Sequence, residues 1–258
     1  MKASDVKFGV EVECYLPTGT IEALGGYHHG LQVAWLPNGW NGQSDSSLSH
    51  CPDGYRAAEI VSPILSGEEG LAQVWFTLEA IKELNGVVNN TCGLHVHVDG
   101  RNLTSQNVKD IKAAFVTYEK AFYGLSGTEA ARRFGSTYCR NSSQWGTDEI
   151  NDQADRYRSL NLTNWHNLDR KKTVEVRVWA GTLEAERVVT AVYMAVALVV
   201  SVVNGTCKGT GSRIENPTQA AKQFVGQTFV NPAARIVDDC TVNEVTRTLL
   251  TACKSARF

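Results

Sequence analysis

The sequence has no strong excess of charge of either sign. Its 258 residues include 25 basic and 27 acidic side chains, which gives a formal net charge of −2 at pH 7. Proteins that coat nucleic acid depend on a surplus of Lys and Arg, so this balance argues against a nucleic-acid partner. The apolar content of 43% is too high for a disordered chain and sufficient for one sizeable core. We therefore expect a single domain over residues 1–258.

Closely spaced cysteine pairs are also missing, because the seven cysteines are scattered and form no C-x-x-C motif. This spacing argues against a structural zinc site and against a disulfide framework. Residues 1–10 contain no apolar segment of the kind found in secretory signals. The longest apolar run, Val188–Val203, is too short to cross a bilayer comfortably. We therefore expect a cytoplasmic protein with no membrane partner, in which this run forms a buried core helix.

Short β-branched segments alternate with helical ones along the chain. Several consecutive strand segments have no crossover helix between them, which predicts a mainly antiparallel sheet. The predicted class is α+β, with a sheet of about six strands and helices covering one of its faces. The predicted strands are 6–16, 31–36, 56–62, 93–99, 157–162 and 173–179. Helices are predicted from Gly67 to Asn85, after Thr104, from Glu184 through the apolar run, from Pro217, and after a capping box formed by Thr241 and Glu244.

Three of the predicted strands alternate apolar with ionisable residues. Because successive side chains point to opposite faces of a strand, each of the three presents one ionisable face. These faces carry Glu11 and Glu13, then His95, His97 and Asp99, and then Glu175 and Arg177. An ordinary solvated face would mix Lys, Thr, Ser and Gln, and for any single strand it remains the alternative. Together, the three faces offer side chains that bind Mg²⁺ or Mn²⁺ and phosphate.

A further carboxylate stands in an otherwise apolar strand. Glu59 follows the segment Asp45-Ser46-Ser47-Leu48 and precedes Pro63, where the strand ends. A buried carboxylate needs a partner, and a metal ion is the simplest one. The alternative is a solvated glutamate on an edge strand.

The motifs in this order resemble the amidoligases, a family of carboxylate–amine ligases similar to glutamate–cysteine ligase and glutamine synthetase. They are F-G-V-E-V-E, D-S-S-L followed by E-I-V-S-P-I-L, C-G-L-H-V-H-V-D, Y-R-S-L-N-L and T-V-E-V-R-V-W. The resemblance covers about residues 6–200 and implies a curved, glutamine-synthetase-like sheet whose concave face holds ATP and Mg²⁺, with Mn²⁺ as a substitute. Segment 28–43 lies outside it, and 201–258 is expected to be a helical elaboration.

The resemblance also implies a role for each site residue. The metal ligands would be Glu11, Glu13, Glu59 and Glu175. One of His95 and His97 would approach the metal-bound nucleotide phosphates, and Arg177 would contact the transferred phosphoryl group. Arg158 and Asn161 would line the nucleotide or substrate pocket. The implied reaction joins a small-molecule or peptide carboxylate to an amine through an acyl phosphate, with Arg177, Glu59 and Arg158 as the catalytic residues.

Two other functions are compatible with the residues. The first is a different metal-dependent enzyme that uses His95-x-His97, although the glutamate expected shortly after such a pair is replaced by Val98-Asp99-Gly100-Arg101. The second is a non-catalytic carbohydrate- or peptide-binding domain, suggested by six Trp and eight Tyr. A P-loop nucleotide site is excluded, because no G-x-x-x-x-G-K-[ST] segment occurs.

Overall fold

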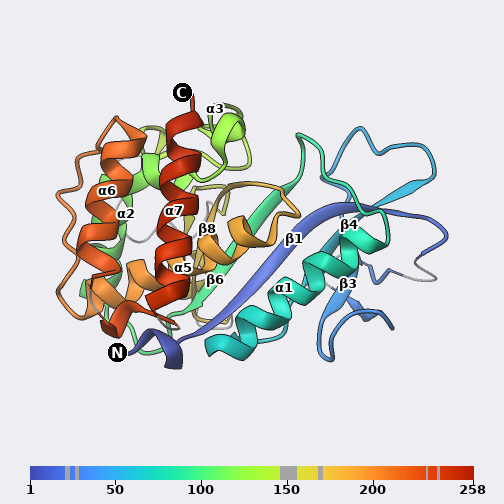
Figure 1. Cartoon of the computed structure of the whole chain (residues 1–258), viewed down its shortest axis with the longest axis horizontal. Coiled ribbons are helices and arrows are strands. Elements are labelled where there is room, and N and C mark those ends of the chain that lie inside the picture. Colours follow the sequence, from blue (N-terminus) through green and yellow to red (C-terminus); the bar gives the residue numbers. More distant parts are fainter. Residues whose placement is uncertain (21–23, 27–28, 146–155, 168–170, 231, 237–238) are drawn as a thin grey trace.

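An antiparallel sheet organises the fold (Figure 1). The structure, a computed structural model, describes residues 1–20, 24–26, 29–145, 156–167, 171–230, 232–236 and 239–258. Seven strands follow one another in the order β2-β3-β4-β1-β6-β8-β7, and β5 pairs with the first residues of β1. The strands are β1 (Lys7–Pro17), β2 (Leu31–Gln32), β3 (Asn41–Ser44), β4 (Tyr55–Val61), β5 (Leu65–Ser66), β6 (Gly93–Asp99), β7 (Leu160–Asn161) and β8 (Thr173–Ala180). The antiparallel α+β prediction is confirmed.

The sheet differs from the prediction in the number and length of its strands. It has eight strands rather than about six, and the segments predicted at 31–36 and 157–162 contribute only the two-residue strands β2 and β7. The sequence analysis missed β3, because Asn-Gly-Gln-Ser contains no β-branched or aromatic residue. Pairing with β4 makes this segment a strand. Tertiary contacts therefore override a weak local preference there.

The helices begin and end where the sequence provides caps. Thr104 caps α2 in a capping box with Asn107, and Asn216 caps α6 with Pro217 in its first turn. After α1, Asn85 adopts a φ of 60°, and the Gly86 N–H donates to the Ile81 carbonyl. The α-helices are α1 (Gly67–Glu83), α2 (Ser105–Gly124), α3 (Ala130–Arg133), α4 (Thr163–His166), α5 (Ala185–Val203), α6 (Pro217–Thr228) and α7 (Asp239–Ser255). Short 3₁₀ helices are Ala3–Asp5, Gly127–Glu129, Ser142–Gln144 and Pro232–Ala234.

One predicted helix start is wrong. The helix α7 begins at Asp239, so Thr241 lies within its first turn and is not the residue that precedes it. A Thr-x-x-Glu pattern is a local signal, and it does not decide where a helix begins when an earlier residue can continue the same turn.

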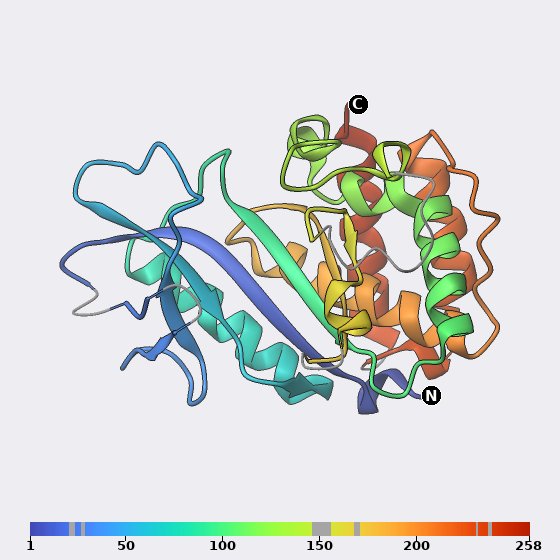
Figure 2. The same ribbon diagram turned by 180° about the vertical axis from the view of Figure 1, so that it is seen from behind.

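The long helices cover one face of the sheet and leave part of the other open (Figures 1 and 2). The apolar residues of β1, Phe8, Val10 and Val12, are buried on the covered face. The same hydrophobic cluster continues through α5 to Cys253 in α7. The opposite face of the central strands is seen in Figure 2 in front of the helices. The alternation read from the sequence therefore assigns the apolar side chains to the core and the ionisable ones to the open face.

The apolar run predicted as a core helix is α5. By length and composition this helix could cross a bilayer, but 78% of its most apolar 18-residue window is buried inside the protein. It contacts α1, α2, α7 and β6. This burial confirms the prediction of a core helix.

We expect Leu198→Ala to reduce the free energy of unfolding by about 2–5 kcal/mol, because Leu198 is fully buried in α5 and its truncation leaves a cavity. Urea denaturation followed by circular dichroism measures the change. Glu186→Gln, at an exposed position in the first turn of the same helix, is the control and should cost less than about 1 kcal/mol. Equal effects of the two substitutions would contradict the burial of α5.

Candidate active site

The strand register brings the ionisable side chains of four adjacent strands together. On the open face, residues of neighbouring strands lie directly opposite one another in pairs. These pairs are Glu13 with Glu59 between β1 and β4, Glu11 with His95 between β1 and β6, and His97 with Glu175 between β6 and β8. Residues that are up to 164 positions apart in the sequence (175 − 11) therefore form one cluster. All six were named from the sequence, and the structure brings all six together.

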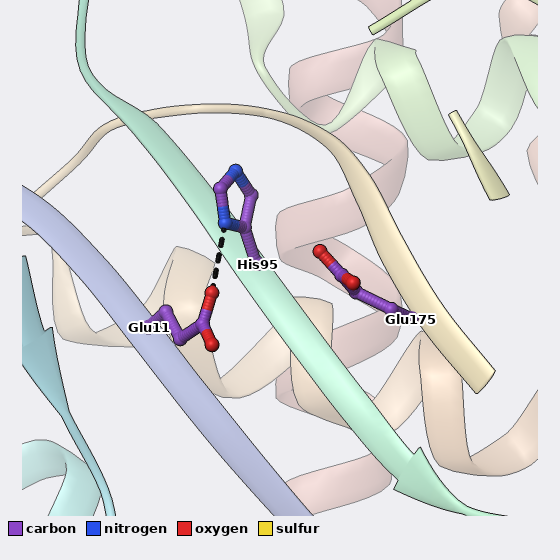
Figure 3. A group of neighbouring side chains, drawn as sticks. All are labelled: Glu11, His95 and Glu175. Atoms are coloured by element: carbon purple, nitrogen blue, oxygen red, sulfur yellow. Dashed lines mark hydrogen bonds and ion pairs between the residues drawn. The ribbon is translucent and has the colours of Figure 1, made fainter. Parts of the chain in front are cut away.

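The first group within this cluster is Glu11, His95 and Glu175, each from a different strand (Figure 3). One donor atom from each residue lies within 4.8 Å of the other two. The Nδ1 atom of His95 is 3.1 Å from Oε2 of Glu11. His95 and Glu175 are buried, and Glu11 is partly buried. Three donors at this spacing can surround one divalent cation.

A second group shares the same histidine. Glu13, Glu59 and His95 also place one donor atom each within 4.8 Å of the other two, and all three residues are buried. Nε2 of His95 is 3.7 Å from Oε1 of Glu13. The two groups together offer four carboxylates and one imidazole, a donor set that suits Mg²⁺ or Mn²⁺. The residues present therefore fit a divalent cation in each carboxylate pair, with His95 as a ligand of one of the two, because a neutral imidazole binds a metal through one nitrogen.

The second histidine interacts with the carboxylates as a cation. Burial by itself would lower the pKa of His97, but the carboxylates of Glu11 and Glu175 outweigh burial and raise this pKa to about 9. Conversely, burial would raise the pKa of Glu11, and the two histidines instead lower it well below its usual value. The pKa of Glu175 is also lowered, because His97 and Arg177 outweigh its burial. Without a metal ion, the protonated His97 thus compensates two of the glutamates.

The environment of Glu59 differs from that of Glu11 and Glu175. Burial and the neighbouring carboxylate of Glu11 raise the pKa of Glu59 to about 8, although the amide of Gln43 donates a hydrogen bond to it. The strand β4 lies between β3 and β1, so the alternative of a solvated glutamate on an edge strand is wrong. Sequence reasoning missed Gln43, because its strand carries no recognisable pattern.

A β-bulge shapes the position of Arg177. Leu94 lies opposite Trp179 and Val96 opposite Val176, so two residues of β8, Arg177 and Val178, face the single residue between them on β6. The guanidinium of Arg177 donates from Nη1 to Oε1 of Glu175 at 2.5 Å, and its Nε is buried without a hydrogen-bond partner. The Glu–Arg ion pair is present, and the Nε donor remains available to a ligand.

The two residues predicted from Y-R-S-L-N-L have different environments. The Asn161 side chain lines the cavity and donates to Oε2 of Glu175 at 2.6 Å. Arg158 is not among the described residues that line the cavity, and its guanidinium lies 5.7 Å from the ring centroid of Trp145. The two residues are an odd number of positions apart, and extended chain directs such side chains to opposite faces. The structure therefore does not support a pocket-lining role for Arg158.

The cluster lies in a cavity of about 1400 Å³ whose two walls differ in charge. The wall from residues 39–64 includes Asp45 and Glu59, and no Lys or Arg among the described lining residues comes from it. Apart from Lys7, the described Lys and Arg of the lining all come after residue 100, and they are Arg101, Arg132, Arg133, Arg156, Lys171, Lys172 and Arg177. One side of the cavity is thus suited to a cationic group and the other to an anionic one.

Sequence reasoning also missed the importance of Gly93 at the start of β6. A Cβ atom at this position would lie 3.1 Å from Nη2 of Arg133 and 3.2 Å from both Oε2 of Glu13 and Nε2 of His95. Its N–H donates to Oε2 of Glu13 at 2.5 Å. A side chain at this position would therefore crowd the second carboxylate group and Arg133. The motif C-G-L-H-V-H-V-D contained this residue, but nothing in the motif showed why a side chain would be unfavourable there.

A comparison with known families agrees with the motifs. Residues 27–145 match the sequence model of a family described as "putative amidoligase enzyme". This span, just under half of the chain, includes Glu59, His95 and His97, whereas β1 and β8 lie outside it. The match supports the resemblance to the amidoligases, a family of ligase-type enzymes, over this part of the chain. It also includes segment 28–43, which the motifs had left outside the resemblance. A search of curated proteins found no match.

We expect Glu59→Gln to stabilise the metal-free protein at pH 9 and to have little effect at pH 5. A folded-state pKa of about 8, above the ordinary carboxyl value, means that the wild type loses stability as pH rises between the two values. Glutamine carries no charge at either pH and can still accept a hydrogen bond from Gln43. Thermal unfolding in EDTA across this pH range measures the difference. If the melting temperatures of Glu59→Gln and of the wild type differ by the same amount at pH 5 and at pH 9, the pKa of Glu59 is not raised.

Proposed function

We propose that this protein is an ATP- and Mg²⁺-dependent carboxylate–amine ligase. The observation that carries the proposal is the pair of carboxylate groups that share His95, located on one open sheet face beside Arg177 and inside one cavity. The family match supports the ligase class independently of this geometry, since it does not include β1 or β8. A glutamine-synthetase-like catalytic sheet is part of the same proposal.

Two Mg²⁺ ions would be held by the two groups, one beside Glu11 and Glu175 and the other beside Glu13 and Glu59. His95 would be a ligand of only one of them, because a neutral imidazole has one nitrogen free to bind a metal. Mn²⁺ would be an acceptable substitute, because it takes the same oxygen-rich ligands. When bound, the ions neutralise the carboxylates and the charge of the polyphosphate. Asn161 keeps Glu175 oriented through its side-chain amide, and Gln43 does the same for Glu59.

The proposed reaction has two steps. A carboxylate oxygen of the acid substrate attacks the γ-phosphate of ATP, which forms an acyl phosphate and releases ADP. The ammonium group of the second substrate gives a proton to solvent, and the resulting amine attacks the acyl carbon. Inorganic phosphate leaves, and the nitrogen gives up a second proton to solvent as the amide forms. Activation is needed because a carboxylate is a poor electrophile. The protein contributes by placing the reactants next to each other and by offering positive charge to the transferred group.

The charge of the cavity walls suggests how the substrates are oriented. An amine is protonated near neutral pH, and the wall with Asp45 would attract it. Phosphates would bind on the side that carries Lys171, Lys172 and Arg177. The acid and the amine would be small molecules or peptides, and we place the reaction in the cytoplasm with neither nucleic acid nor a membrane as partner.

The test of the function is incubation with Mg-ATP and pools of acids and amines, followed by measurement of ADP and of new masses. We expect ADP release that depends on an acid, a product heavier than either substrate, and loss of both signals in EDTA. ATP binding should also weaken greatly in EDTA, because four carboxylates and the polyphosphate would repel one another without the ions. Turnover of a substrate without ADP release would favour another metal-dependent enzyme. Tight binding of a sugar without binding of Mg-ATP would favour a carbohydrate-binding domain.

We expect Arg177→Lys to keep the fold and the binding of Mg-ATP, while the rate of ADP formation falls on the order of 10²-fold. Lysine keeps the ion pair with Glu175 but loses the planar fork that can hold a second oxyanion. Single-turnover formation of ADP in the presence of an acid substrate measures this step. Arg56→Lys is the control, because Arg56 is an exposed strand arginine that is not among the lining residues. A normal rate of ADP formation in Arg177→Lys would show that Arg177 pairs with Glu175 and does not act in phosphoryl transfer.

A further inference from the structure

Arg133 is a buried cation in the cavity for which the motifs assign no role. It is the last residue of α3, only 5% of its surface is exposed, and it lines the cavity. The helix α3 lies against β8, and Nη2 of Arg133 donates to the backbone carbonyl oxygen of Arg177 at 2.8 Å. One end of the guanidinium is therefore fixed by the strand that carries Glu175 and Arg177.

Within the part of the chain that the structure describes, the rest of this guanidinium has no hydrogen-bond or ion-pair partner. Its Nε is buried without a hydrogen bond, and among the residues that the structure describes no carboxylate oxygen lies within the 4.0 Å of an ion pair. Arg177, which lies next to Arg133 in the site, is paired with Glu175. Arg132, which precedes Arg133 in the sequence, is paired with Glu129. An uncompensated buried charge is unfavourable, and an anionic ligand would compensate it.

Arg133 lies beside the second carboxylate group. Nη2 of Arg133 is 3.1 Å from the point that a Cβ atom of Gly93 would occupy, and the same point is 3.2 Å from Oε2 of Glu13 and from Nε2 of His95. Only a glycine therefore fits between the guanidinium and the group formed by Glu13, Glu59 and His95 without crowding them. Arg133 and this group line the same cavity, so an oxyanion bound beside the group would lie next to the guanidinium.

We propose that Arg133 is an oxyanion-binding residue of the cavity. Resting on the proposed function, its ligand is the carboxylate of the acid substrate or the phosphoryl group transferred to that carboxylate. A guanidinium donates charge-assisted hydrogen bonds to either oxyanion. Arg177 is paired with the carboxylate of Glu175, whereas Arg133 donates to a neutral carbonyl, so Arg133 adds a positive charge that no carboxylate among the described residues pairs with.

The test is calorimetric titration in excess Mg²⁺ with two probes, inorganic phosphate and acetate. Arg133→Gln should weaken the binding of the preferred probe by about tenfold or more. Arg187→Gln is the control, because Arg187 is about one-third exposed, is paired with Glu184 and is not among the lining residues, and it should change the affinity less than about threefold. Tighter binding of phosphate identifies the phosphoryl group as the ligand, and tighter binding of acetate identifies the substrate carboxylate.

Gly93→Ala tests the position of Arg133, because the added methyl group crowds its guanidinium and leaves the residue itself unchanged. Its added methyl group would meet only the ends of three side chains, at 3.1–3.2 Å, so the fold should persist. We expect it to weaken the same probe by about tenfold. The proposal is overturned if wild type binds neither probe, or if Arg133→Gln and Gly93→Ala both bind them as the wild type does.

Failure of the proposal for Arg133 can be distinguished from failure of the proposed function. Loss of probe binding in both variants, in a protein that forms no ADP with any acid, would support the oxyanion site and contradict the ligase. Acid-dependent ADP formation in a protein whose variants bind the probes normally would support the ligase and contradict the role of Arg133.

Discussion

The structure depends on keeping like charges close together on one face of a sheet. Glu13 and Glu59 lie directly opposite each other, an arrangement that destabilises a sheet unless something compensates it. The partners that offset this repulsion differ from one carboxylate to the next. His95 and His97 contact Glu11, while His97 and Arg177 lie beside Glu175, and Glu59 accepts a hydrogen bond from an uncharged amide. These partners hold the carboxylates at a spacing that two divalent cations can use.

Apolar packing on the covered face of the sheet offsets the cost of this arrangement. The same strands that present carboxylates on one face bury valines on the other, against α5 and the helices around it. Burial of apolar surface stabilises the folded state by about 25 cal/mol for each Å². This free energy fixes the register of β1, β6 and β8, because a slip of one residue would exchange the two faces. The core therefore supplies the rigidity that a metal-binding site needs, and the site in turn adds little to stability.

Segments outside the central strands complete the site. Gln43 comes from a short strand, Arg133 from a four-residue helix and Asn161 from a two-residue strand, and each contacts a residue of the central strands. Their positions follow from the contacts of those segments with β4 and β8. Substrate-facing residues on such short elements can differ while the central carboxylates stay in place, which separates the choice of substrate from the chemistry.

The sequence by itself determined the α+β class, the long helices and the six ionisable residues of the open face, because strand alternation with a period of two is a local property. The motif order also identified the amidoligase resemblance. The tertiary structure places Glu59 inside the sheet, brings His95 next to both carboxylate groups, and includes Arg133 but not Arg158 among the described residues that line the cavity. Strand order, a bulge opposite His95 and the packing of α3 against β8 decide these positions, and all three depend on contacts between residues far apart in the chain.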